Sequence, residues 1–309
     1  MTNSTASLRH KIDTAGELQS VVRTMKAIAA SSIGQYEKSV RALADYYRAV
    51  ELGLSVCIRH SAQAAVPVRR QSKDVDVMGA VVLGSDQGLV GRFNELIVDK
   101  AMSALSAAPQ RRRRVWAVGE RVHSRLTDAG LTLEGLFAVP NSVQAIAPLV
   151  GQILMATEAG RDKDEVAEFH LFYNRPTSGS GYEPVSQRLL PLDAAWGREL
   201  AELPWPTHNV PEVVGDDTAT LGALVREYLF ISLFRACAES LASENASRLA
   251  AMQRAEKNID ESLETLHVAF YRARQSSIDE ELFDVISGFE ALSGEGDGVQ
   301  DHRSSKSTS

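Results

Sequence analysis

The most constraining feature of the sequence is a long segment near its C-terminal end that contains neither glycine nor proline. It runs over Ala223–Ser287, about 65 residues, whereas an average helix of a globular protein has about 11–12. Apolar residues recur along it in steps of three and four, the spacing of one helix face. The segment predicts one very long helix, with Asp216 or Asp217 as its N-cap and Gly288 and Gly294 at its fraying end.

The beginning of the chain repeats this pattern. From Ser7 to about Arg59 there is no proline, and the apolar stripe is narrow, as in a coiled-coil seam. If both helices leave the intervening domain from the same side, they run antiparallel, and residue 5 lies level with about residue 268. The C-terminal helix then extends about 20 residues further, roughly 30 Å, and its apolar side chains need a sheath from another protein. The same register places Cys57 and Cys237 too far apart for a disulfide.

The middle of the chain alternates strands and helices, which indicates a mostly parallel sheet with both faces covered, a Rossmann-like α/β domain. We therefore expect a shaft helix over 1–60, an α/β domain over 61–215, a second shaft helix over 216–292 and a disordered tail over 293–309. The expected strands are Val75–Leu83, Val115–Val118, Leu131–Val139, Val166–Tyr173 and Val185–Leu190, and the expected helices are Asn94–Leu105, Glu120–Asp128 and Val143–Glu158.

Composition and charge exclude several classes of protein. The hydrophobic fraction of 44% and the charged fraction of 24% are typical of a soluble globular protein, and a net charge of -7 disfavours nucleic-acid binding. The longest apolar run near the centre, Val77–Gly84, is too short to cross a bilayer, and no secretory signal begins the chain. The two cysteines are isolated and the histidines scattered, so we expect no metal and no cofactor.

Several stretches of the sequence match the motifs of one protein family. The first is "LRHKIDTAGELQSVVRTMKAIAASS" (Leu8–Ser32). Near the other end, "SLASENASRLAAMQRAEKN" and "YRARQSSIDEELFDVISGFEAL" follow the spacing of the family's C-terminal helix. In the middle, "GSDQGLVGRFN" and "QRLLPL" match the family's glycine-rich loop and the close of its sheet domain. With these stretches the chain resembles the gamma subunit, the central rotor shaft, of rotary ATP synthases. The resemblance covers residues 8 to 292, with departures that suggest a divergent branch or a second, alternative ATP synthase.

This resemblance implies a fold, a function and partners. The two terminal helices would form an antiparallel coiled coil inside a ring of alternating alpha and beta subunits, with the beta subunits catalytic. The α/β domain would lie on the membrane c-type rotor ring beside the epsilon subunit. The chain would be a non-catalytic rotor that couples proton or sodium flow to ATP synthesis or hydrolysis. It would be peripheral, at the cytoplasmic face of the cell membrane.

The resemblance also implies contact residues on the shaft. Arg23, Met25 and Lys26 lie in the region that would face an acidic loop of the catalytic subunits. On the C-terminal helix, further positions match the contacts of the family with the catalytic ring. These are Arg248, Arg274, Gln275 and Asp279, of which Asp279 departs from the threonine that is common in the family. Without the resemblance, Arg248 reads as a surface partner of Glu244 one helical turn earlier.

The loop "GSDQGLVGRFN" would approach the lower part of a catalytic subunit through Asp86, Gly88 and Arg92. Gln87 replaces the arginine of the family pattern, and we hypothesise that Arg92 supplies the lost charge. If so, the Arg92→Gly variant would couple ATP hydrolysis to ion transport less well than the wild type.

Other classes of function stay open on the residues alone. Gly84, Gly88 and Gly91 follow a strand and precede a helix, as in nucleotide-binding folds, and Glu120 stands where a ribose-binding acid would stand. The spacing matches neither phosphate-binding motif, so a tight strand-to-helix turn is the simpler interpretation. A free-standing helical scaffold is a third possibility. The run Arg111–Arg114 is interpreted as a solvated loop, or else as a contact with polar loops of the membrane ring or acidic lipid headgroups.

Overall fold

A computed structural model of the protein describes residues 5–63, 77–107, 112–158, 166–177, 181–190, 194–209 and 211–294. The chain divides into two compact units. The first unit consists of Met1–Thr24 and Gln253–Ser309, and the second of Met25–Met252. The tail was expected to begin at residue 293. Residues 293 and 294 are still helical, and the rest of the expected tail lies outside the described residues.

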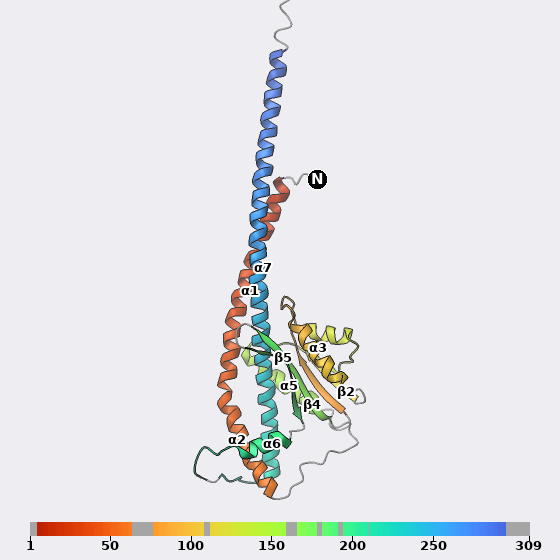
Figure 1. Ribbon diagram of the computed structural model, residues 1–309, viewed down its shortest axis with the longest axis vertical. Coiled ribbons are helices and arrows are strands. Elements are labelled where there is room, and N and C mark those ends of the chain that lie inside the picture. The colour runs from red at the N-terminus through yellow and green to blue at the C-terminus, as the bar shows by residue number, and fades with distance from the viewer. Residues whose placement is uncertain are drawn as a thin grey trace, which may run out of the picture. The chain divides into compact units, whose positions relative to one another are not determined.

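Long helices form both ends of the chain, as the sequence predicts (Figure 1). α7 covers Asp217–Gly294, 78 residues, and α1 covers Thr5–Ala42, 38 residues. The N-terminal helix differs from the prediction because α2, Ala44–Gln63, is separated from α1 by the single residue Leu43. The Tyr47 N–H still donates to the Leu43 carbonyl at 2.8 Å, so the hydrogen bonding continues past this irregularity.

The second unit contains a five-stranded sheet in the order β3-β2-β1-β4-β5. β1 pairs in parallel with β2 and β4, β2 pairs in parallel with β3, and β5 is antiparallel to β4. The strands are β1 Val77–Leu83, β2 Arg112–Val118, β3 Gly135–Phe137, β4 Val166–Pro176 and β5 Tyr182–Leu190. The mostly parallel sheet of the sequence analysis is thereby confirmed.

The third strand is much shorter than the expected Leu131–Val139. The Leu131 N–H donates to the Leu126 carbonyl at 3.0 Å, because this residue closes the turn after α4. The backbone reaches the sheet only at Glu134, whose N–H donates to the Val115 carbonyl at 2.8 Å.

Helices cover both faces of this sheet (Figure 1). One face packs against α3 and α4 around Val82, Ile97 and Leu126. The other packs against α5 and the central part of α7, and Tyr36 of α1 joins this cluster. The helices between the strands are α3 Phe93–Ser106, α4 Glu120–Asp128, the 3-10 turn η1 Val143–Ala145 and α5 Ile146–Glu158. Because α7 takes the place of a layer helix, its apolar residues are part of the domain core.

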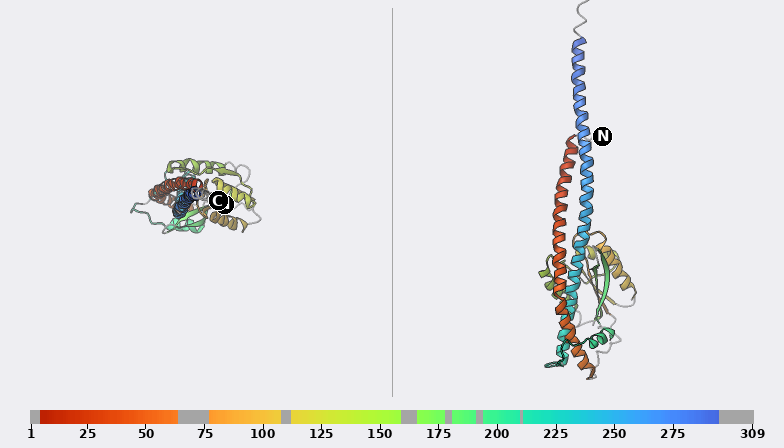
Figure 2. Two further views of the ribbon diagram at one scale, coloured as in Figure 1. Left: turned by 90° about the horizontal axis from the view of Figure 1, so that it is seen from above. Right: turned by 60° about the vertical axis from the view of Figure 1, so that its left-hand side comes forward.

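Within the second unit, α1 and α2 run antiparallel to α7 (Figures 1 and 2). The Tyr46 hydroxyl donates to Glu227 Oε1 at 2.6 Å, and the rings of Tyr47 and Tyr228 are 6.0 Å apart. The two cysteines, Cys57 and Cys237, are both free and buried.

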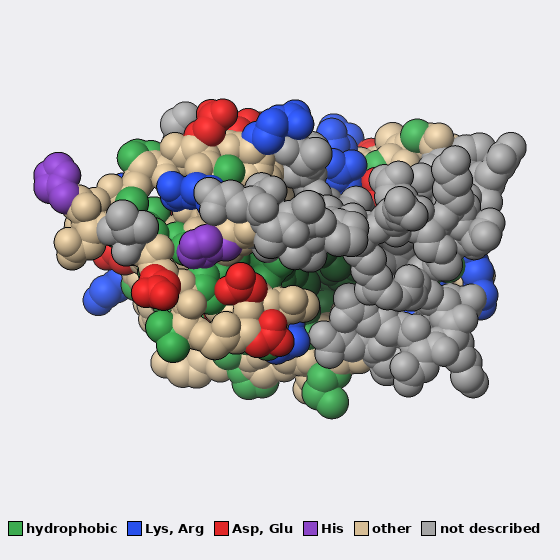
Figure 3. Space-filling model, turned by 90° about the horizontal axis from the view of Figure 1, so that it is seen from below, with side chains coloured by type: hydrophobic (Ala, Val, Ile, Leu, Met, Phe, Trp, Pro, Cys, Tyr) green, Lys and Arg blue, Asp and Glu red, His purple; other side chains and the backbone are tan. Residues whose placement is uncertain are grey.

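A helix that the sequence did not predict, α6 at Ala194–Glu202, packs on this helix pair. Leu200 is buried with Leu54 and Tyr228, and the Arg59 guanidinium donates to the Leu203 carbonyl at 3.1 Å. Seen from below, the part of the second unit that is coloured by type shows acidic and basic side chains interspersed with apolar ones (Figure 3).

The arginine run belongs to the sheet and not to a solvated loop. Arg112–Arg114 begin β2 and pair with β1, while Arg111 lies outside the described residues. The Arg114 guanidinium lies 5.2 Å from the centre of the Trp116 ring, and its Nη2 is 3.4 Å from Glu134 Oε2. The loop interpretation is therefore wrong for these three residues, because all three pair with β1 and the Arg114 side chain packs on an aromatic ring.

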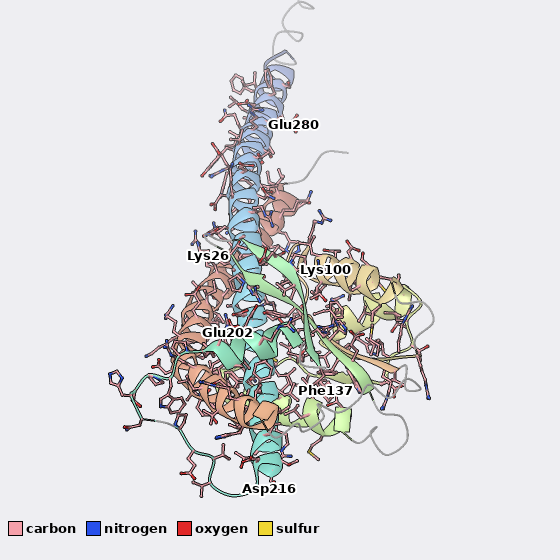
Figure 4. The ribbon with its side chains drawn as sticks, turned by 60° about the horizontal axis from the view of Figure 1, so that its bottom comes forward. Lys26, Lys100, Phe137, Glu202, Asp216 and Glu280 are labelled. Carbon is pink, nitrogen blue, oxygen red and sulfur yellow. The ribbon has the colours of Figure 1, made fainter. Side chains whose placement is uncertain are left out.

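The start of α7 follows the predicted capping. The Thr218 N–H donates to Asp216 Oδ1 at 2.9 Å, and Figure 4 labels Asp216 at this end of the helix. A carboxylate at this place satisfies one of the free N–H groups of the first turn.

Candidate functional site: the loop after the first strand

The loop that joins β1 to α3, residues Gly84–Arg92, is the candidate site of the α/β domain. A Cβ atom on Gly84 would lie 2.4 Å from Val122 Cβ and 2.8 Å from Asn94 Oδ1. Gly119, at the end of the next strand, has φ +110°, and a Cβ there would lie 2.8 Å from the Ser85 carbonyl carbon. These two glycines allow backbones to approach closely, which agrees with the tight-turn interpretation.

The polar groups of the loop bond mainly to one another. The Ser85 N–H donates to Asn94 Oδ1 at 3.0 Å, and Asn94 Nδ2 donates back to Ser85 Oγ at 2.8 Å. Ser85 Oγ donates to the Gln87 carbonyl at 2.8 Å. Ser85 and Asn94 are buried, so these hydrogen bonds fix the loop more firmly than exposed ones would.

Asp86, a predicted contact residue, has a structural task. Its Oδ1 accepts from the Glu120 N–H and its Oδ2 from the Val139 N–H, both at 3.0 Å. The carboxylate therefore satisfies the first turn of α4 and ties the residues after β3 to the loop. Glu120, the candidate ribose acid, meets the loop through its backbone.

Helix α7 forms hydrogen bonds with this loop and with β4. Ser247 Oγ donates to the Val90 carbonyl at 2.5 Å, and Ser243 Oγ donates to the Asn174 carbonyl at 3.1 Å. Asn174 Nδ2 donates in turn to the Phe93 carbonyl at 3.0 Å. The polar run in the middle of α7 thus docks the helix on β4 and on the loop.

This docking fills the place where a doubly wound fold binds a nucleotide. Such ligands lie outside the carboxyl ends of the strands, at the point where the strand order reverses. Here that point lies between β1 and β4, where Asn174 of β4 donates to the Phe93 carbonyl and Ser243 of α7 donates to the Asn174 carbonyl. The adjoining cavity between Gly84, Pro140 and Cys237 has about 10 Å³, room for about one water molecule. The geometry gives no support to a nucleotide site.

Arg248 forms a buried ion pair close to the loop. Its Nη2 is 2.5 Å from Glu244 Oε1, and the side chains are 14% and 7% exposed. Burial raises the pKa of Glu244, Arg248 lowers it, and Asp86 raises it. The pairing with Glu244 that the residues alone suggested is present, but it is buried and not on the surface.

Leu89 is the one non-glycine residue with a positive φ, +62°, in the part of the chain that the structure describes. The left-handed region costs an L-residue other than glycine about 1–2 kcal/mol. The Leu89 side chain is 62% exposed. Sequence reasoning missed this residue because nothing in its type or spacing signals a positive φ.

In the first unit, Arg23 and the end of α7 carry the other predicted contacts. Arg23 Nε is 3.1 Å from Glu256 Oε1, and Gln19 donates to Asp260.

These contacts give the register of α1 against α7 in the first unit. Thr5 is fourteen residues before Gln19, and Arg274 is fourteen residues after Asp260, so Thr5 lies level with Arg274. The register predicted from the sequence, residue 5 with about residue 268, is therefore short by about one and a half turns.

Beyond that level, α7 continues with exposed apolar side chains. Arg274, Gln275 and Asp279 are also exposed, and Gln275 Nε2 donates to Asp279 Oδ1 at 3.2 Å. The exposed apolar residues of this segment, named here the apolar end of α7, are Ile278 49%, Leu282 57%, Phe283 70%, Val285 70%, Ile286 45% and Phe289 73%. A series of this kind on a single helix marks a surface that another protein covers.

The predicted contact residues therefore fall into separate groups. Asp86, Gly88 and Arg92 share the loop of the second unit, and Arg248 lies in the helix that closes it. Met25 and Lys26 are half-buried on α1 in the same unit. Lys26 is labelled in Figure 4 on the α1 side, away from Lys100 on α3.

Among the described residues, no group of three or more histidine, cysteine, aspartate or glutamate side chains is placed to hold a metal ion. Within the same residues, no helix is long and apolar enough to cross a membrane.

The fold and the loop define a protein with two long terminal helices and a doubly wound α/β domain between them, whose ligand crevice is closed by one of those helices. The family model described as ATP synthase matches residues 4–292, and the chain belongs to this family.

Relatives and solved structures agree with this assignment. An ATP synthase gamma chain of Sorangium cellulosum is 29% identical over 322 residues, covering 94% of this chain and 99% of the relative. One of Nostoc punctiforme is 28% identical and covers 93% and 98%. The rotor of Euglena gracilis mitochondrial ATP synthase has the same fold, with a TM-score of 0.58, 17% identity and coverage of 89% and 98%.

Proposed function

We propose that the chain is the central-stalk rotor subunit of an ATP synthase, which couples proton or sodium flow to ATP synthesis or hydrolysis by rotating inside the catalytic ring. Family membership and gamma-chain relatives that align over nearly their whole length support this function. The observation that carries it is the apolar end of α7, because this exposed segment needs a sheath and a ring of subunits would supply one.

The proposed partners are the alpha and beta ring subunits around the shaft, the epsilon subunit, and the membrane c-type ring next to the α/β domain. A similar fold occurs in the Euglena gracilis complex of OSCP, F1 and c-ring, with a TM-score of 0.61 and 15% identity. We further propose that the chain is peripheral, at the cytoplasmic face of the cell membrane. Its net charge of -7 supports the proposal that it binds no nucleic acid.

We propose a mechanical and non-catalytic role. The α/β domain receives torque from the membrane ring, and α7 transmits it because the core of that domain includes α7 itself. An asymmetric shaft then makes different contacts with each catalytic subunit in turn. A partner with several conformations shifts toward the one that makes the better contacts, which is the physical content of coupling.

The proposed contact residues lie in both units. In the first unit, Arg23, Arg274, Gln275 and Asp279 are exposed and available to the ring. In the second unit the proposed contacts are Met25, Lys26, Asp86, Gly88, Arg92 and Arg248. Two of these residues also have a structural role. Asp86 ties the loop to α4, and Arg248 forms an ion pair with Glu244.

Co-purification with the ring subunits of the host tests this function. The full chain, a chain truncated after Arg274 and a control truncated after Gly294 are each expressed with those subunits. The first truncation removes only the part of α7 beyond the level of Thr5 and the tail, and the control removes only the tail. We expect the full chain and the control to assemble and to drive ion uptake on ATP hydrolysis, and the shorter chain to lose one or both. A full chain that never associates with the ring would refute the rotor function.

A further inference from the structure

Helix α7 carries two separate apolar faces within the first unit. One of them faces α1 (Figure 2) and includes Glu256, whose carboxylate lies 3.1 Å from Arg23 of α1. From there, half-buried residues recur in steps of three and four, at Ile259, Leu263, Leu266, Phe270 and Ala273. The positions that continue this face are exposed and polar: Ser277, Glu280, Asp284 and Ser287. The face that packs on α1 therefore ends near the level at which α1 itself begins.

The second face begins at Val268 and continues along the exposed part of α7. Its residues also recur in steps of three and four, but they are offset by two residues from the first face, which is about 160° around the helix. All of them are exposed: Val268, Tyr271, Gln275, Ile278, Leu282, Val285 and Phe289. Apolar residues at two positions of a seven-residue repeat are the pattern of a coiled coil, and a single polar residue in the seam fixes its register. This second face, named here the outer seam, is therefore built to pair with another helix.

The charges that flank the outer seam change sign along it. Arg272 and Arg274 flank its first half, whereas Asp279 and Glu281 flank its second half. All four side chains are exposed. A helix that covers this seam should be acidic beside the two arginines and basic beside the two acids. The same segment of a second copy of this chain, running in the opposite direction, meets both conditions.

We propose that two copies of this chain pair through their outer seams as an antiparallel coiled coil. The proposal goes beyond the rotor function, since it concerns the chain outside the ring. The layers of the dimer are Val268 with Val285, Tyr271 with Leu282, and Gln275 with Ile278, and the two-fold axis repeats each of them.

The flanking charges select this register and this direction. Arg272 meets Asp279 of the second copy and Arg274 meets Glu281, and each pair occurs twice, which gives four attractive pairs. A shift by one seven-residue repeat in one direction brings Asp279 onto Asp279 and Glu281 onto Glu281, and a shift in the other direction brings the arginines onto themselves. A parallel pair would keep only the contact of Arg274 with Asp279.

Pairing of this kind would protect the apolar end of α7 before assembly. In the function proposed above the ring covers the same face, so insertion into the ring and pairing with a second copy exclude each other. Exposed apolar surface of this extent promotes aggregation when nothing covers it. The second copy therefore serves as a replaceable cover.

Sedimentation equilibrium of the purified full-length chain over a range of concentrations tests the dimer. Leu282→Gln removes an apolar residue of the outer seam, whereas Phe283→Gln removes its neighbour, which is 70% exposed and lies outside the seam. We expect the wild type and Phe283→Gln to shift from one chain to two as the concentration rises, and Leu282→Gln to weaken this association by about tenfold or more. A wild type that stays monomeric, or equal weakening by both substitutions, would overturn the proposal.

Charge reversal tests the pairs that flank the seam. One variant combines Arg272→Glu with Arg274→Glu, and the other combines Asp279→Arg with Glu281→Arg. We expect each variant alone to remain monomeric, because all four pairs become repulsive, and the equimolar mixture to dimerise like the wild type. Dimerisation of the mixture also shows that both variants are folded. A monomeric mixture, or a variant that dimerises alone like the wild type, would contradict the charge pairing.

A spin label on Ser262→Cys tests the direction of pairing. Ser262 is exposed, and both native cysteines are buried, so the label goes to one place on each chain. Antiparallel pairing about a centre between Gln275 and Ile278 separates the two labels by about 45 Å. Parallel pairing would bring them within about 20 Å, and a distance in that range, measured by electron–electron double resonance, would refute the antiparallel dimer. All these measurements use the chain alone, so a negative result here leaves the rotor function standing.

Discussion

Gly119 and Gly130 both have a positive φ, +110° and +85°, but their surroundings differ. A Cβ on Gly119 would lie within 3 Å of the Ser85 backbone, whereas a Cβ on Gly130 meets nothing within 4 Å. We expect Gly119→Ala to lower the unfolding free energy by about 2–4 kcal/mol, because backbone strain and overpacking add. Gly130→Ala should cost only about 1 kcal/mol, since it carries the strain alone. Urea unfolding of the two variants measures both values, and equal losses would contradict the close approach of the two loops.

Glu244 gives a prediction about pH. Burial raises its pKa above the ordinary value of 4.5, so the folded chain holds this proton more tightly than the unfolded chain. The stability that this group contributes is therefore greatest below about pH 4.5 and is lost as pH rises through the higher pKa of the folded state. We expect the unfolding free energy of the wild type, relative to Glu244→Gln, to decrease between about pH 4 and pH 7. Urea unfolding at several pH values measures this difference, and an increase over the same range would show that the pairing with Arg248 outweighs burial.

At the scale of elements, one carboxylate ties α7 to the sheet. Glu239 is 7% exposed and its oxygens lie 2.7 Å from Arg235 Nε on α7 and 3.4 Å from Arg175 Nε on β4. Both arginines are partly exposed and can turn to water, so we expect Glu239→Ala to cost only about 1–2 kcal/mol. Glu261→Ala is the control, because Glu261 and its partner Lys257 are well exposed, and its effect should be below about 0.5 kcal/mol. Unfolding curves that do not separate the two variants would contradict a structural role for Glu239.

The elements that the sequence predicts well are those with a strong local signal. The absence of glycine and proline from Ala223 to Ser287 and the cap at Asp216 predict α7 almost to its ends. α6 was missed, since its place depends on contacts of Leu200 with α2 and α7 that lie far away in the sequence.

The candidate site was predictable only in part, for a similar reason. The glycines and Asp86 marked the loop, but the hydrogen bonds of Ser243 and Ser247 join segments about 70 and 160 residues apart. The positive φ of Leu89 was missed as well, because neither its residue type nor its spacing signals it.

At the scale of the whole molecule, the chain offers a simple route to site-specific labelling. Its two cysteines, Cys57 and Cys237, are 1% and 3% exposed. Burial raises the pKa of both thiols, that of Cys237 to about 12, and thiols that stay protonated react slowly. We expect the wild-type chain to take up little maleimide at neutral pH and Lys100→Cys, on the exposed face of α3, to take up one label quickly. Mass spectrometry counts the labels, and rapid labelling of the wild type would contradict the burial of the two thiols.

The measurement that decides most directly whether this chain is a rotor uses that labelled position. The complex of Lys100→Cys with its ring subunits is fixed to a surface through the ring, and a bead is attached to the new thiol. We predict rotation in one direction that starts on addition of ATP and stops when ATP is removed. A complex that hydrolyses ATP at its normal rate while the bead only fluctuates about a fixed position would contradict the rotor function.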